Sequence, residues 1–186
     1  MNTKLMAVFA ALVLFFTPYA ASAQTTPQTA EEFLTRGNLF VSRGDFETAI
    51  IDFTDAIRLD PNSASAYNNR GQAYAQIGDN ARAISDYNHA IRLNPNLAGT
   101  YINRGLVYMQ SNDLDLAIAD FGQVIRLNPN LAGAYINRGH IYFRRGDYGL
   151  AITDYEAALR LEPNNAHASQ WLAEARRWYD QTRRTR

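Results

Sequence analysis

The chain has 186 residues, 18 Lys and Arg against 18 Asp and Glu, and no cysteine. The absence of cysteine excludes disulfide cross-links, thiol redox chemistry and thiolate-ligated zinc. A formal net charge of zero gives no electrostatic support for a nucleic acid partner, and the few arginines of the C-terminal tail do not change this.

Residues 1–23 have the pattern of a secretory signal peptide. Lys4 precedes an unbroken apolar run over residues 5–16, Pro18 breaks the run, and Ala21-Ser22-Ala23 fits a cleavage site. The alternative is a membrane anchor, but the run is shorter than the roughly 20 residues that a spanning helix needs. We therefore expect cleavage after Ala23, a polar linker over residues 24–29, and no stable membrane insertion of the mature chain. No lipidation cysteine follows the run, so the expected location is periplasmic or secreted.

The rest of the chain repeats with a period of 34 residues. Three markers keep this spacing: a proline, a glycine and the arginine before that glycine. They are Pro61, Pro95, Pro129 and Pro163; Gly37, Gly71, Gly105 and Gly139; Arg36, Arg70, Arg104 and Arg138. A fixed period of this length is the signature of a repeat architecture. It divides the chain into units over residues 30–63, 64–97, 98–131 and 132–165, followed by 166–186.

Each unit contains the patterns of two helices. In the second unit, Tyr67, Gly71 and Tyr74 share one face of a first helix, and Gly71 is placed where a second helix crosses closely. Gly78 can end the first helix and Asp79 can N-cap the next. Equivalent pairs are Gly44-Asp45, Asn112-Asp113 and Gly146-Asp147. Because the connections are short, the two helices of a unit must pack antiparallel.

This pattern resembles the tetratricopeptide repeat. With Ala30, Ala64, Ala98 and Ala132 as position 1, all four copies match the signature at positions 4, 8, 11, 20, 24, 27 and 32, except that Val124 replaces the usual alanine at position 27. The resemblance implies an all-α, right-handed solenoid of four helix–turn–helix units with a concave groove lined by the first helices. Residues 166–186 are predicted as a capping helix and basic tail, frayed over 181–186.

An arginine and an aspartate recur at positions 7 and 23 of every repeat. The pairs are Arg36 and Asp52, Arg70 and Asp86, Arg104 and Asp120, and Arg138 and Asp154. The two positions fall at the same level of antiparallel helices, so the spacing predicts four ion pairs within repeats. The alternative is a row of ligand-binding arginines, which we consider weaker because a partly buried arginine needs a partner.

No pattern in the sequence indicates catalysis. His89, His140 and His167 lack metal-ligand spacing on one helix. There is no Gly-x-Ser-x-Gly turn and no phosphate-binding loop. We therefore expect a non-enzymatic protein without metal or cofactor.

The resemblance also implies which side chains line the groove. They are Asn38, Asn69, Gln72, Ile102, Asn103, Leu106, Ile136, Asn137, His140, Phe143, Trp171 and Trp178. The first two repeats contribute mostly amides, whereas the later repeats and the cap contribute apolar and aromatic side chains.

Two groups within this set suggest binding. Asn69, Asn103 and Asn137 share position 6, similar to the asparagine ladder of O-linked N-acetylglucosamine transferases, and amides can bond an extended peptide backbone. The alternative is that asparagine is merely common at this position. Trp171 and Trp178 lie seven residues apart and share a helix face, where they either bind a partner or only seal the last repeat.

One binding mode of the family is not expected. Some members hold a C-terminal carboxylate with two asparagines and several basic groove residues. Asn38 and Asn69 match the asparagines, but Leu34, Gly99 and Asn103 occupy the basic positions. Without that positive charge we do not expect carboxylate binding.

The function expected from the sequence is that of a scaffold that binds a peptide or protein segment in the groove, in the cell envelope. Two alternatives remain: a structural factor that self-associates into a homo-oligomer, and an accessory protein whose tryptophans stack on glycan.

Overall fold

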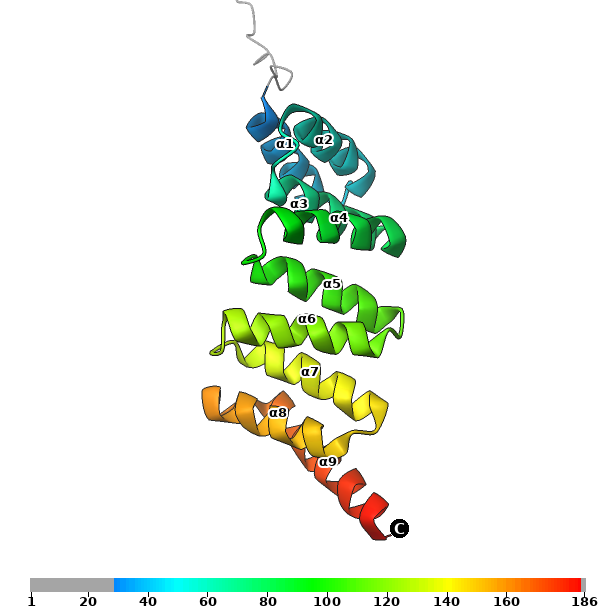
Figure 1. Cartoon of the computed structure of the whole chain (residues 1–186), viewed down its shortest axis with the longest axis vertical. Helices are drawn as coiled ribbons and strands as arrows, with labels where there is room; N and C mark the ends of the chain where they lie inside the picture. Colours follow the sequence, from blue (N-terminus) through cyan, green and yellow to red (C-terminus); the bar gives the residue numbers. More distant parts are fainter. Residues whose placement is uncertain (1–28, 185–186) are drawn as a thin grey trace, which may run out of the picture.

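The computed structural model describes residues 29–184, so the predicted signal peptide lies outside the described residues. Over these residues the chain forms helices and no strand, as Figure 1 shows. The helices are α1 (Ala30–Ser42), α2 (Phe46–Leu59), α3 (Ala64–Gln76), α4 (Asn80–Leu93), α5 (Ala98–Gln110), α6 (Leu114–Leu127), α7 (Ala132–Arg145), α8 (Tyr148–Leu161) and α9 (Ala166–Arg184). The predicted fold class, four helical pairs and a final helix, is confirmed.

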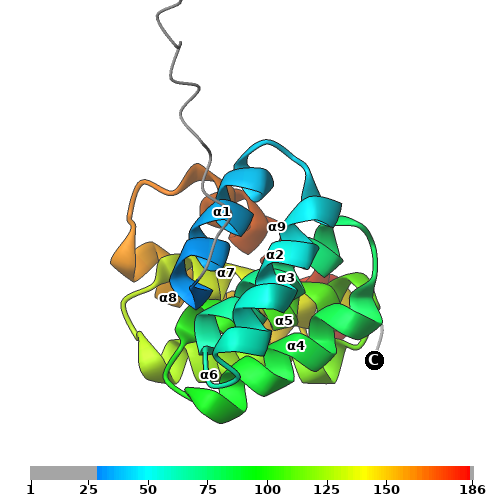
Figure 2. The same ribbon diagram turned by 90° about the horizontal axis from the view of Figure 1, so that it is seen from above.

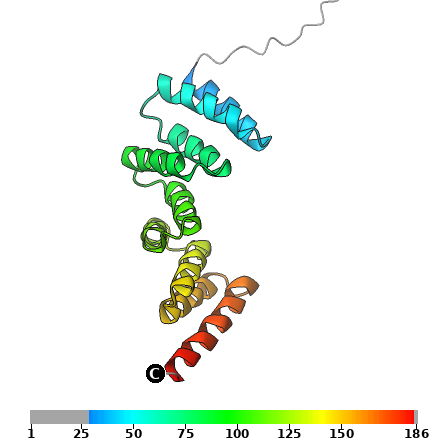
Figure 3. The same cartoon turned by 90° about the vertical axis from the view of Figure 1, so that its right-hand side faces the viewer.

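The helices are arranged as a stack of antiparallel pairs. Figure 1 shows the pairs following one another along the long axis in sequence order, and Figure 3 shows the same stack from the side. Seen along the axis in Figure 2, successive pairs are rotated, as in a superhelix. Each pair therefore contacts mainly its neighbours, which is the architecture of a solenoid.

The two helices of each repeat approach closely at one glycine. A Cβ atom on Gly71 would lie 2.9 Å from the Tyr87 ring and 3.2 Å from the Ala83 carbonyl oxygen, so the predicted close crossing is confirmed there. The same contact recurs in the other repeats, between Gly37 and Phe53, Gly105 and Phe121, and Gly139 and Tyr155. These aromatic side chains are buried completely or nearly so. The interior thus contains a row of aromatic rings from the second helices, each packed against a glycine of the first helix of its repeat.

The turns within repeats follow the predicted punctuation. Gly44, Gly78 and Gly146 have φ angles of 77°, 80° and 86°, and Asn112, at the equivalent position, has a φ of 64°. This left-handed conformation favours glycine and tolerates asparagine. The Asp45 and Asp79 carboxylates cap the second helices, accepting from backbone N–H groups at 3.1 and 3.0 Å.

At the other two turns the predicted N-cap position is confirmed, but the predicted capping hydrogen bond is wrong. Asp113 and Asp147 make no side-chain capping hydrogen bond. The Asp147 carboxylate instead accepts from the Arg145 guanidinium. A nearby cation thus competes with the backbone for this carboxylate.

The last helix covers the C-terminal end of the stack. Ala168, Leu172 and Ala175 of α9 are buried, and Leu172 and Ala175 pack against α8. The expected fraying over residues 181–186 is wrong for 181–184, which continue the helix to Arg184. Within the described chain, no helix combines the length and the apolar character needed to cross a membrane.

Candidate functional site

The structure brings together all four predicted arginine–aspartate pairs. The shortest contacts are 2.6 Å for Arg36 and Asp52, 2.8 Å for Arg70 and Asp86, 2.6 Å for Arg104 and Asp120, and 2.7 Å for Arg138 and Asp154. Each guanidinium donates through two nitrogens to both carboxylate oxygens. Every one of these aspartates is buried. The arginines therefore neutralise charge in the interior and hold together the two helices of each repeat.

Two of these arginines also link neighbouring repeats. The Arg70 Nη1 donates to the Thr54 hydroxyl of the preceding repeat at 3.1 Å, and the Arg104 Nη1 donates to the Asn88 side-chain oxygen. At the following junction the equivalent residue is Gly122, which has no side chain to accept a bond from Arg138. The residue at repeat position 25 therefore determines whether the next arginine bonds to the preceding repeat. The sequence-based prediction did not include this hydrogen bond.

The asparagines of the first three repeats form one hydrogen-bonded chain. The Asn103 side-chain amide donates to Asn68 at 3.3 Å, Asn68 donates to Asn69 at 3.0 Å, and Asn69 donates to Asn38 at 2.8 Å. Asn68 connects the third repeat to the asparagines of the first two. Each of these amides therefore uses one or two of its hydrogen-bonding positions within the protein, and Asn137 is not part of the chain.

A cluster of rings occupies the opposite end of the predicted groove. Trp171 of α9 packs edge-on against His140 and Phe143 of α7, with ring centroids 4.9 and 5.3 Å apart. The Trp171 indole N–H donates to His167 Nε2 at 3.1 Å. The structure thus joins the predicted residues His140, Phe143 and Trp171 in one site, which we call the aromatic cluster.

The aromatic cluster borders a small cavity. It has a volume of about 230 Å³ and is lined by Met109, His140, Phe143, Arg144 and Trp171. The Arg144 guanidinium is held in place, because it donates to the Met109 carbonyl oxygen and to the Asn112 side chain, both at 3.0 Å. The cavity lining therefore combines packed rings with a fixed cation.

His140 lines this cavity and can titrate. Its Nε2 is buried and has no hydrogen-bond partner among the described residues. Burial, and secondly the neighbouring His167 ring at 5.1 Å between centroids, lower the pKa of His140 to about 4. His140 is consequently neutral near pH 7, and the cavity wall that it forms carries no charge.

Several predicted groove residues lie elsewhere. Ile136 is only 8% exposed and packs with Ala158 and Ala168, so its assignment to the groove is wrong, because α9 covers it. Ile102 and Leu106 are half-buried against Ala117 and Phe121 of their own repeat and Ile141 of the next.

Gln72 and Asn103 border a separate hollow of about 280 Å³.

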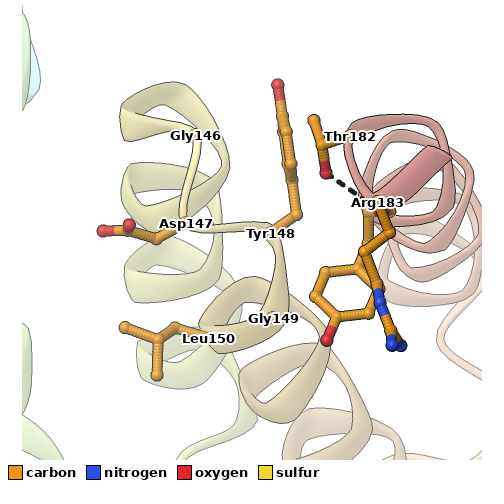
Figure 4. Close-up of a pocket in the computed structure, with 8 residues that line it drawn as sticks. Gly146, Asp147, Tyr148, Gly149, Leu150, Thr182 and Arg183 are labelled. Atoms are coloured by element: carbon orange, nitrogen blue, oxygen red, sulfur yellow. Dashed lines mark hydrogen bonds between the residues drawn. The ribbon is translucent and has the colours of Figure 1, made fainter. Parts of the chain in front are cut away.

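The second tryptophan lies farther along α9. Trp178 is 37% exposed, stacks on Tyr148 with centroids 6.0 Å apart, and does not line the cavity of the aromatic cluster. Tyr148 also borders an open pocket between the start of α8 and the end of α9, shown in Figure 4. In this view Thr182 and Arg183 line the side formed by α9. Because Tyr148 also packs edge-on against Phe143 at 5.2 Å between centroids, it lies between Trp178 and the aromatic cluster.

The described residues hold no group of His, Asp and Glu side chains that could bind a metal ion. The side chains that this surface presents are polar and aromatic. What they offer is packing and hydrogen bonding at fixed positions.

Comparisons with known proteins identify the repeat. A TPR repeat model matches residues 37–78 and 71–111, and a tetratricopeptide repeat model matches residues 106–176. A search of curated proteins finds no match.

Solved structures share the fold. A crystal structure of MamA protein aligns with a TM-score of 0.76 and 25% identity, covering 81% of this chain and 82% of that one. MamA from Desulfovibrio magneticus RS-1 aligns with a TM-score of 0.76 and 23% identity, covering 83% and 87%. The first TPR of Spaghetti (RPAP3), bound to the HSP90 peptide SRMEEVD, aligns with a TM-score of 0.61 and 29% identity, covering 63% and 95%.

Proposed function

Because the chain belongs to the tetratricopeptide repeat family, whose fold serves as a protein–protein interaction scaffold, we propose that it binds an extended segment of a partner protein on its concave surface. The segment is anchored by one large apolar side chain in the cavity of the aromatic cluster. The observation that carries this proposal is the cavity itself, since it is small, apolar in its walls and bordered by an indole ring.

The size of the cavity fits a side chain and excludes a large ligand. A volume of about 230 Å³ is below the 300–1,000 Å³ typical of small-molecule sites. The rings of Phe143 and Trp171 and the Arg144 cation disfavour a positively charged anchor, because it would lose its hydration there without gaining a counterion. A leucine, methionine or phenylalanine side chain meets these conditions.

The relative that holds a peptide supports binding of an extended chain. The RPAP3 structure contains an acidic HSP90 peptide. In the present protein, Asn69 donates to Asn38, and Leu34 and Gly99 stand where basic groove residues would be needed. We therefore propose the same general mode with an apolar anchor in place of an acidic one.

We further propose that the protein works outside the cytoplasm. This rests on the signal-peptide pattern over residues 1–23, with its cleavage site at Ala23. The alternative of glycan binding finds less support, since Trp171 packs edge-on within the cluster.

Selection from a random peptide library on the purified protein tests the proposal. We expect enriched peptides to share a large apolar residue and to lose binding to Phe143→Ala. Asn69→Ala, a change in the amide chain, is the matched control and should retain binding. Enriched peptides that bind Phe143→Ala as well as they bind the wild type would contradict the proposed anchor.

A further inference from the structure

Among residues 29–184, the outer face of α1 has the position of a helix-packing surface, but no helix packs on it. At every later junction, repeat positions 3 and 10 are buried against the preceding repeat. Position 3 is Ala66, Thr100, Ala134 and Ala168, and position 10 is Ala73, Val107, Ile141 and Ala175, all between 0 and 3% exposed. In α1 the same positions are Glu32, which is exposed, and Leu39, which is 47% exposed.

Positions 7 and 14 also contact the preceding repeat where there is one. Position 7 does so through the Arg70 and Arg104 bonds described above. Position 14 does so where Arg145 Nη1 lies 2.6 Å from Asp115 Oδ1. The equivalent residues of α1 are Arg36, which is 40% exposed although it pairs with Asp52, and Arg43, which is exposed.

These four residues form one stripe, which we call the α1 face: Glu32, Arg36, Leu39 and Arg43. They follow one another at steps of four, three and four, so they share one side of the helix. An open hollow of about 840 Å³ lies against this side, and no helix of the described residues covers it.

The charges along the α1 face are self-complementary. Its start is acidic at Glu32 and its end is basic at Arg43, with Arg36 and Leu39 between them. A second α1 placed antiparallel brings Glu32 opposite Arg43 of the second copy and lays Leu39 beside the aliphatic stem of the second Arg36. The twofold axis repeats each contact, and the opposed helix dipoles add attraction.

We propose that the α1 face is a self-association surface, at which two copies of this chain pack their α1 helices antiparallel. The carboxylate of Glu32 takes part through its charge while it keeps its capping bond to the Thr29 N–H. A single helix face is smaller than the roughly 1,600 Å² of a standard stable interface, so the dimer is weak and favoured by low salt. This surface is separate from the aromatic cluster, and the proposal stands apart from peptide binding.

Sedimentation equilibrium of the full-length protein at low ionic strength, over a range of concentrations, tests the proposal. We expect the mean mass to rise from monomer toward dimer. Leu39→Lys should raise the dimer dissociation constant at least about tenfold, because the central apolar contact is lost. Ile51→Lys is the matched control, because Ile51 is 61% exposed on α2, and should change the constant less than about twofold.

A charge exchange then tests the antiparallel arrangement. Glu32→Arg and Arg43→Glu should each be monomeric alone, because each places like charges opposite one another. A mixture of the two should dimerise about as well as the wild type, since both opposed pairs are again of opposite sign. A wild-type chain that stays monomeric, a dimer insensitive to Leu39→Lys, or a mixture no heavier than its components would overturn the proposal.

Discussion

The two ends of the concave surface are built from the same repeat positions but differ in how their side chains are satisfied. In the first three repeats, Asn38, Asn69 and Asn103 are joined through Asn68 by hydrogen bonds, so each amide already uses part of its hydrogen-bonding capacity within the protein. Around α7 and α9, Phe143 and Trp171 enclose a cavity that nothing in the described chain fills. A polar surface that bonds to itself gains little from a ligand, whereas an apolar cavity gains from one. We infer that affinity is concentrated at the aromatic end.

The largest effects, on the free energy of unfolding, should come from the arginine–aspartate pairs within the repeats that form both ends of the concave surface. Arg104→Ala leaves the buried Asp120 without its cation, so we expect the free energy of unfolding to fall by about 4 kcal/mol. Arg138→Ala should cost about 1 kcal/mol less, because Arg138 has no link to the preceding repeat. Urea unfolding measures both values, and equal losses would show that the Asn88 link contributes nothing.

Truncation of the indole at the aromatic end should have the next largest effect, on binding. Trp171→Ala opens the cavity wall, and we expect it to weaken a selected peptide by about 30-fold, which corresponds to about 2 kcal/mol. Trp178→Ala is the control, since Trp178 does not line the cavity, and should change the affinity less than about threefold. Isothermal titration calorimetry measures the peptide affinity of both variants. A larger loss for Trp178→Ala than for Trp171→Ala would place the anchor near Tyr148 instead.

Acid should weaken the aromatic end specifically. Because the pKa of folded His140 is about 4, below its ordinary value of 6.5, the unfolded chain takes up a proton that the folded chain excludes. Its stabilising contribution is therefore complete above about pH 6.5 and is lost as the pH falls toward 4. We expect a loss on the order of 2 kcal/mol in this window.

The matched variants for this prediction are His140→Phe and His89→Phe. His140→Phe should remove this part of the pH dependence of unfolding, while His89→Phe, at an exposed position, should leave it in place. If both variants show the wild-type slope between about pH 6.5 and 4, His140 is not the group responsible.

The smallest change should be a gain. Gly122→Asn places an acceptor near Arg138 Nη1, which would lie 3.7 Å from a Cβ atom at this position, as Asn88 does for Arg104. We expect about 1 kcal/mol of added stability. Gly122→Ala is the control for helix propensity alone. If thermal unfolding shows Gly122→Asn to be no more stable than Gly122→Ala, a side chain at position 25 does not stabilise the protein by bonding to Arg138.

The repeat pattern is sufficient to predict the architecture, because Gly71, Tyr87 and their equivalents are fixed by local sterics that recur every 34 residues. The ion pairs follow for the same reason, since antiparallel helices of known length bring positions 7 and 23 to one level.

The details of the groove could not be predicted in this way. They depend on how far one repeat rotates relative to the next, which decides that Asn103 contacts Asn68 and not Asn69. The same rotation lets α9 cover Ile136 while it leaves the cavity beside Phe143 open. A single repeat contains no information on such contacts between repeats, because they involve side chains from two or three of them.

The two tryptophans give two indole N–H signals in a ¹H–¹⁵N spectrum. These signals test most directly whether a bound peptide is anchored at the aromatic cluster. The Trp171 indole N–H bonds to His167 beside the cavity, whereas Trp178 lies outside it. When a selected peptide is added, we expect the Trp171 signal to shift in a saturable way and the Trp178 signal to stay. A peptide that binds while the Trp171 signal stays unchanged, and that shifts the side-chain amides of Asn38 and Asn69, would contradict the account.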